Sequence, residues 1–250
     1  MISLRMYLGG GVVALAAFSL VGCAKAKPAP AAGFVEHQLM QEDPSVPFHK
    51  NWVNPAVDRS KYTKLHVAPV NVSYMLEMTE WQKGERALPG ADMEKDVQEL
   101  AEYTRKAIEK AVRDDPKKRF RLVDKPTESP DTMVLEVALI EVVPSKVTLN
   151  ALGYAPFGIG VGIKAVRAFA EDKSSVAFEA RGRDASTNEL LVMAADRETE
   201  QFAPVSVRGL TWYSHAHTII DAWAQQFVQL ENRQQGEVVA DTSALTLKPW

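Results

Sequence analysis

Cysteine is almost absent from this sequence. Cys23 is the single cysteine in 250 residues, so the chain folds without an internal disulfide bond and has no second thiol for catalysis. An excess of charge of one sign is lacking too, since 29 Lys and Arg stand against 32 Asp and Glu, a net charge of −3. This balance gives no basic field for nucleic acid, and we expect no nucleic-acid partner.

A long apolar run is missing from the start of the chain, where a membrane helix is often found. The uncharged stretch 6–20 follows the positive charge of Arg5 and is shorter than the about 20 residues of a bilayer-spanning helix. A basic start followed by a short apolar run is typical of a secretory signal peptide. We therefore expect residues 1–22 to be removed.

The apolar stretch ends in a motif that predicts covalent lipid attachment. Leu20, Val21, Gly22 and Cys23 resemble the lipobox of bacterial lipoproteins, in which the cysteine accepts lipid after cleavage. The resemblance implies a diacylglyceryl group and an N-acyl chain, such as palmitate, on Cys23, and no other cofactor. Three acyl chains hold a protein firmly on a membrane. The alternative is a cysteine that happens to follow an ordinary cleavage site.

The residue after the cysteine bears on location. It is Ala24 rather than aspartate, and in the enterobacterial sorting scheme this implies export to the outer membrane. We therefore expect the protein in the cell envelope, at the periplasmic face of the outer membrane.

The rest of the chain divides by composition. Residues 23–33 contain two prolines and no large apolar residue, which favours a solvated, lipidated tether. Residues 34–231 carry enough apolar residues for a single globular domain, and residues 232–250 form a C-terminal tail. Within the domain, residues 34–61 contain three prolines and favour irregular chain packed on the domain.

Periodicity predicts two helices and several strands. Residues 93–113 and 211–230 each have an apolar stripe at spacings of three and four, and Trp223 falls on the second stripe. The expected strands are 65–67, 120–123, 132–143, 175–183 and 190–195. In 175–183 apolar and polar residues alternate, which predicts one solvated face. The fold class is therefore α/β (α+β), a mixed, largely antiparallel sheet with two amphipathic helices mostly on one face, in two layers.

The order of these pieces resembles a known family. The lipobox, the tether, residues 61–70 and 100–108, the strand at 134–143 and the hairpin at 178–184 are similar to the bacterial lipoproteins classed as domain of unknown function 3313. The resemblance extends to residues 223–227. It implies an envelope location and an α/β domain, and supplies no activity or site residues.

Candidate chemistry in the chain is sparse. His217 and Asp221 lie four residues apart on one helical face and are weak metal candidates, but His215 is about 200° round the helix, so we expect no metal site. A glycine-rich stretch, residues 158–165, contains Gly-x-Gly-x-x-Ala but lacks the preceding strand of a dinucleotide site. Asp184, Asp196 and Glu198 are carboxylates of the hairpin, for which ion pairing with neighbouring arginines is the favoured role, and no catalytic residue is predicted.

Two features indicate contact with other molecules. Trp212 and Tyr213 begin the last helix and are candidates for stacking on a glycan. Residues 149–170 are unusually apolar for a connection between strands. This segment is expected either to form a helix over 159–169 that covers the sheet or to contact a membrane or partner. The residues that would make that contact are Ile159, Ile163, Lys164 and Arg167.

These observations favour a lipid-anchored, non-enzymatic binding or assembly module that faces the periplasm and meets an envelope protein or glycan. The alternative is a periplasmic enzyme that acts on a cell-wall or lipid substrate.

Overall fold

A mixed sheet of six strands forms the centre of the fold. The computed structural model describes residues 26–75, 93–126, 129–143, 175–199, 213–234 and 236–241. The strands are β1 (Lys50–Val53), β2 (Lys64–Val67), β3 (Arg121–Leu122), β4 (Thr132–Val143), β5 (Ser175–Asp184) and β6 (Leu190–Thr199). Their order in the sheet is β1-β6-β5-β4-β2-β3. Neighbours from β1 to β4 run antiparallel, whereas β2 runs parallel to both β4 and β3, which confirms the expected α+β class.

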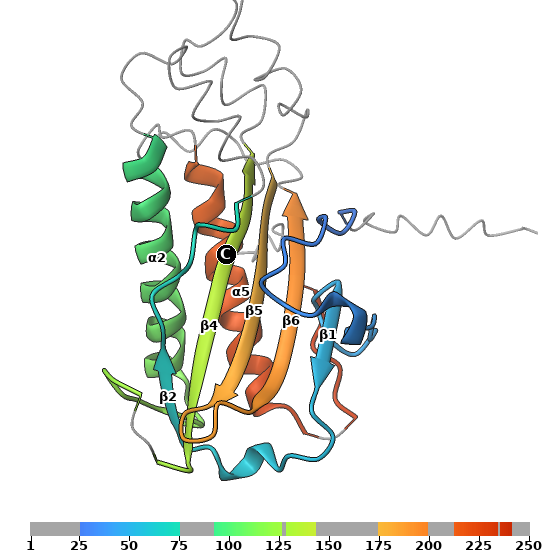
Figure 1. Cartoon of the computed structure of the whole chain (residues 1–250), viewed down its shortest axis with the longest axis vertical. Coiled ribbons are helices and arrows are strands. Elements are labelled where there is room, and N and C mark those ends of the chain that lie inside the picture. The colour runs from blue at the N-terminus through green and yellow to red at the C-terminus, as the bar shows by residue number, and fades with distance from the viewer. Residues whose placement is uncertain are drawn as a thin grey trace, which may run out of the picture.

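Two long helices cover one face of this sheet, called the helix face below (Figure 1). They are α2 (Met93–Asp114) and α5 (Ser214–Asn232), which agree within a few residues with the predicted spans. The predicted stripe of α2 is buried, with Leu100 at its centre, and so is that of α5 from Ala216 to Trp223. Burial of these stripes against the sheet is the main source of helix stability. Neither helix of the described chain has the length and apolar character needed to cross a bilayer.

The long strands β4 and β5 form the middle of the sheet. β4 has the predicted bounds, and a bulge between Leu139 and Glu141 shifts its register with β5. Its two interrupting carboxylates are paired, Glu136 with Arg181 and Arg183, and Glu141 with Arg197. Charged side chains can therefore lie on this part of the sheet because each finds an opposite charge on the neighbouring strands.

The expectation that one face of residues 175–183 is solvated is wrong for the first half of that face, whereas Arg181 and Arg183 in the second half are partly exposed. Ala177 and Glu179, both on the predicted wet face, are fully buried, because residues 26–41 cross the sheet on the side opposite the helices (Figure 1). We call these residues the strap and the face they cover the strap face. Phe34, Val35 and Met40 of the strap pack there against Ala138, Ile140 and Met193.

Residues 26–33, which were expected to belong to a solvated tether, contact the domain as part of the strap. Residues 26–33 are extended and mostly exposed, as expected, yet Ala29 and Ala32 pack on the strap-face core and Ala32 N–H bonds to Glu179. This part of the tether is therefore attached to the domain and not free in solvent.

Three short elements lie in the region expected to be irregular. β1 pairs with β6, and the backbone of Gln41 pairs with Asn51 on the other edge of β1. The 3₁₀ turns η1 (His37–Leu39) and η2 (Arg59–Lys61) flank this strand in sequence. At the other end of the chain, Val239 is buried and its N–H bonds to Ser45 O.

Several predicted features lie outside the described residues. These are the lipobox Leu20, Val21, Gly22 and Cys23, the glycine-rich stretch, and the apolar segment 149–170 with Ile159, Ile163, Lys164 and Arg167.

Candidate functional site

A cavity of about 120 Å³ lies between α5 and the helix face of the sheet. Ala180 of β5 and Ala194 of β6 lie side by side across the sheet, and Ala224 of α5 also lines the cavity. Three alanines from separate elements thus meet where larger side chains would fill the space. An apolar cavity of about 150 Å³ in another protein binds benzene, so this space suits a group of similar size.

The cavity wall is aromatic with one unsatisfied polar atom. Phe178 packs edge-on against Phe48 at 5.4 Å and against Trp223 at 4.6 Å between ring centroids. The side-chain oxygen of Asn51 also belongs to the lining; it is buried and has no hydrogen-bond partner within the described part of the chain. A buried acceptor without a partner is costly. A ligand that donates one hydrogen bond would remove this cost.

The most accessible lining residues mark the opening of the cavity. Val53 at the end of β1 is 37% exposed, and Phe227 and Leu230 of the predicted α5 stripe remain half-buried. Arg59 forms an ion pair of 3.1 Å with Glu231 at this end. The opening therefore combines apolar surface with a charged pair.

A buried polar chain joins the cavity wall to the strap. Trp223 Nε1–H donates to Asp196 Oδ2 at 2.9 Å, and the other carboxylate oxygen accepts from the backbone N–H of His49 and contacts its Nδ1. His49 Nε2 contacts Ala26 O at the start of the strap. Both ring nitrogens of His49 therefore contact oxygen atoms of other segments. The chain of contacts fixes α5, β6 and the strap relative to one another.

A second buried carboxylate, Glu179, holds the middle of the strap. Oε1 accepts from Ala32 N–H at 2.7 Å and contacts His37 Nε2, while Oε2 accepts from Phe34 N–H and Val35 N–H. Successive backbone N–H groups that converge on one anion form a concave binding site for it. The strap therefore closes on Glu179 by the same chemistry that other proteins use to bind external anions.

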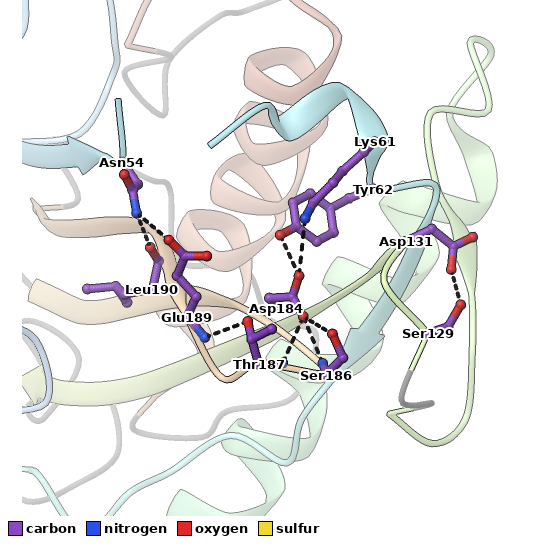
Figure 2. A network of polar contacts seen from close by, with 10 residues as sticks. All are labelled: Asn54, Lys61, Tyr62, Ser129, Asp131, Asp184, Ser186, Thr187, Glu189 and Leu190. Carbon is purple, nitrogen blue, oxygen red and sulfur yellow. Dashed lines mark hydrogen bonds and ion pairs between the residues drawn. The ribbon is translucent and has the colours of Figure 1, made fainter. Parts of the chain in front are cut away.

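Asp184 and Asp196, two of the hairpin carboxylates predicted to form ion pairs, lie far apart. Asp184 lies at the β5–β6 turn, where it accepts from Tyr62 O–H at 2.8 Å and from Ser186 and Thr187 (Figure 2). Burial raises the pKa of Asp184, but these hydrogen bonds outweigh it and hold the pKa well below its ordinary value. Asp196 pairs across the sheet with Phe178 of β5. Phe178 precedes Asp184 by six residues, which is about 20 Å along the strand. Asp184 also forms an ion pair of 3.4 Å with Lys61, while Arg181 and Arg183 pair with Glu136 and Arg197 pairs with Glu141.

The weak metal candidates lie together on a face of α5, against α2. Tyr103 O–H donates to Asp221 Oδ1 at 2.8 Å, and the His217 ring lies on the Tyr103 ring at 4.0 Å between centroids. Burial and this hydrogen bond raise the pKa of Tyr103 to about 12. His215 is buried elsewhere on the helix, and within the described residues no three His, Cys, Asp or Glu side chains are grouped to hold a metal.

Protonation of His215 should destabilise the domain in mild acid. Burial lowers the pKa of this ring to about 4, against a smaller opposing effect of the Ser175 backbone. The ring is neutral when folded and takes up a proton below about pH 6.5 when unfolded, so its contribution is complete above that pH and is lost as the pH falls toward 4. The free energy of unfolding should drop by about 3 kcal/mol over this range.

Urea unfolding at a series of pH values measures this loss. A His215→Leu variant should show a flatter profile between pH 6.5 and 4, whereas His217→Leu, with a half-buried ring, should keep most of the drop. A wild-type profile that is flat over this interval contradicts the prediction.

The aromatic residues of the last helix take structural places. Trp223 is buried, as its position on the apolar stripe predicts. Tyr213 is also buried, and its O–H donates to Glu99 at 3.2 Å, so it offers no free surface for a glycan. Trp212 lies outside the described residues.

Sequence reasoning missed the residues that the fold brings together most tightly. His49 lies 147 residues from Asp196, and Glu179 lies 145 residues from Phe34. The one local signal was a charged residue, Glu179, within the apolar run from Val176 to Ala180 of β5.

Comparisons with known proteins bear on the family. Comparison with curated protein sequences gives no match. Among solved structures, the PelC dodecamer from Paraburkholderia phytofirmans is 15% identical, with a TM-score of 0.36, and the match covers 74% of this chain and 96% of that one. Lipoprotein GNA1162 from Neisseria meningitidis is 14% identical, with a TM-score of 0.23, over 68% and 99% of the two chains. The identities and TM-scores are too low to transfer a function.

The family match is more extensive. Residues 30–227 match the family described as "Protein of unknown function (DUF3313)", a span that runs from the strap through both helices to Phe227 at the cavity. The chain belongs to this family.

Proposed function

We propose that this chain is a lipid-anchored envelope lipoprotein whose domain binds an apolar ligand in the cavity beneath α5. The ligand has the size of one ring or a short alkyl chain and donates one hydrogen bond. The cavity carries the proposal, because its apolar wall favours such a group and the buried Asn51 oxygen lacks a partner within the described chain. Ligand sites are typically apolar with a few placed polar groups.

The anchor in this proposal rests on the sequence. Cys23 carries the lipid, and the acyl chains hold the domain at a membrane. The alanine at position 24 favours the periplasmic face of the outer membrane.

Binding fits the arrangement better than catalysis does. The buried carboxylates Glu179, Asp184 and Asp196 are each engaged by donors of the protein itself. Glu141 is held by Arg197. Carboxylates that are held by hydrogen bonds or an ion pair within the protein stabilise the fold. The cavity wall itself presents chiefly apolar side chains.

Filling the cavity should abolish binding. Ala194→Leu adds three carbon atoms to the wall, and we expect the affinity for 4-bromophenol, a single ring with one hydroxyl donor, to fall roughly ten-fold or more. Bromine quenches indole fluorescence on contact, so titration of protein that begins at residue 24 reports entry through Trp223, which lines the cavity.

The matched control is Ala56→Leu, which makes the same change at an exposed position outside the cavity and should bind like the wild type. The melting temperature of Ala194→Leu should equal or exceed the wild-type value, which separates filling from damage. Equal quenching in the wild type and in Ala194→Leu would refute the cavity as the binding site.

A further inference from the structure

The start of the strap is fixed to the domain by buried groups. The Ala26 carbonyl contacts His49 Nε2, and His49 is bound in turn to Asp196. The side chains of His49 and Asp196 are 8% and 1% exposed. Ala26 is therefore attached to the edge of the sheet formed by β1 and β6, ahead of the contacts that Glu179 makes with the strap.

This attachment shortens the link between domain and lipid. In the sequence, Ala26 follows Cys23 by three residues, and three residues reach at most about 10 Å. A tether that was free as far as Phe34 would have eleven residues and reach about 36 Å. The headgroup layer on one side of a bilayer is itself about 5–7 Å thick. A lipid on Cys23 thus leaves Ala26 almost no distance from the headgroups.

We infer that the short link holds the edge of the domain at Ala26 against the lipid headgroups, with α2 on the far side. The inference rests on the lipid anchor of the proposed function. The charges near this edge agree with it, since the charged residues between Cys23 and Gly33 are two lysines. One of them, Lys27, is exposed in the strap, and Lys50 of β1 follows His49. Lysine side chains near a bilayer surface are attracted to anionic lipids.

The orientation also places the cavity relative to the membrane. His49, which holds Ala26, immediately precedes β1, and Val53 at the opening of the cavity ends the same strand. Four residues of extended chain span about 13 Å. The opening therefore lies within reach of the interface and does not face away from it.

Fluorescence quenching in vesicles tests the orientation. Because lipid consumes the thiol of Cys23, a cysteine introduced at Lys27 or Lys106 is the free thiol for a bimane label. Lys106 projects from α2, with 68% of its side chain exposed. The full-length lipidated protein is placed in phosphatidylethanolamine and phosphatidylglycerol vesicles that contain a lipid with a nitroxide on its headgroup. We expect strong quenching at Lys27→Cys and little at Lys106→Cys.

Lengthening the link provides the matched control. Twelve Gly and Ser residues inserted between Lys25 and Ala26 add a flexible chain of about 19 Å average span, and quenching at Lys27→Cys should fall to the level at Lys106→Cys. Circular dichroism checks that the insertion leaves the fold unchanged.

The outcomes separate this inference from the anchor itself. Protein that incorporates palmitate but shows equal quenching at the two sites overturns the orientation while the anchor stands, and so does quenching at Lys27→Cys that survives the insertion. Protein that incorporates no palmitate and does not float with vesicles overturns the proposed anchor instead.

Discussion

Replacing Cys23 with serine should remove the protein from the membrane fraction. A serine hydroxyl does not form the thioether that carries the diacylglyceryl group. Each buried CH₂ of an acyl chain contributes about 0.8 kcal/mol to membrane binding, so the loss of three chains removes far more affinity than surface lysines supply. Labelled palmitate should enter the wild-type protein and not Cys23→Ser, and flotation on a density gradient should separate the two.

A serine placed one residue later is the matched control. Ala24→Ser makes an equally small change beside the cleavage point and keeps the thiol, so it should incorporate palmitate and float. Wild-type protein that is recovered without label, or Cys23→Ser that floats as the wild type does, contradicts the lipoprotein assignment.

The elements that the sequence predicts well are those in which local pattern and tertiary burial agree. The stripe of α2 and that of α5 as far as Trp223 are buried as expected, and β4 has its predicted bounds. Each of these segments is long enough for its period to be recognised. The four-residue β1 lies among prolines and has no such period, so it was predicted as irregular chain.

The solvated face predicted for β5 shows where pattern reasoning fails. The alternation from Val176 to Arg183 is present, but a polar residue on one side does not say whether water or protein meets it. Glu179 finds its partners in the strap, more than 140 residues earlier in the chain. Such contacts depend on the whole topology and leave no periodic signal in either segment.

The cavity could not be predicted for a related reason. It exists because Ala180, Ala194 and Ala224 come together from two strands and a helix. Alanine is common in helices and strands, and one alanine does not indicate a void. A cavity depends on how the side-chain volumes of different elements fit together, whereas hydropathy patterns indicate only which side chains are buried.

The strap is the part of the fold that depends most on a single residue. Glu179 is 0% exposed and is the acceptor for three strap N–H groups. Arg181 supports the same segment, since its guanidinium donates to Phe34 O and lies 4.2 Å from the Phe34 ring centroid. Without the carboxylate these N–H groups would be buried without an acceptor, a cost of about 1–3 kcal/mol each.

Glu179→Gln should therefore release the strap and destabilise the domain. Each carboxylate oxygen faces at least one strap N–H, so either orientation of the amide sets an NH₂ group against a donor. We expect the free energy of unfolding to fall by about 2–4 kcal/mol. The loss cannot exceed the free energy with which the strap binds the sheet, because the side chain at position 179 is hydrated once the strap has detached. The amides of Phe34 and Val35 should lose their protection from hydrogen exchange, while those of β4 and β5 stay protected.

Glu136→Gln is the control, since this side chain on the same face is 30% exposed and its ion pairs contribute at most about 1 kcal/mol. If Phe34 and Val35 keep their protection in Glu179→Gln, the carboxylate does not hold the strap.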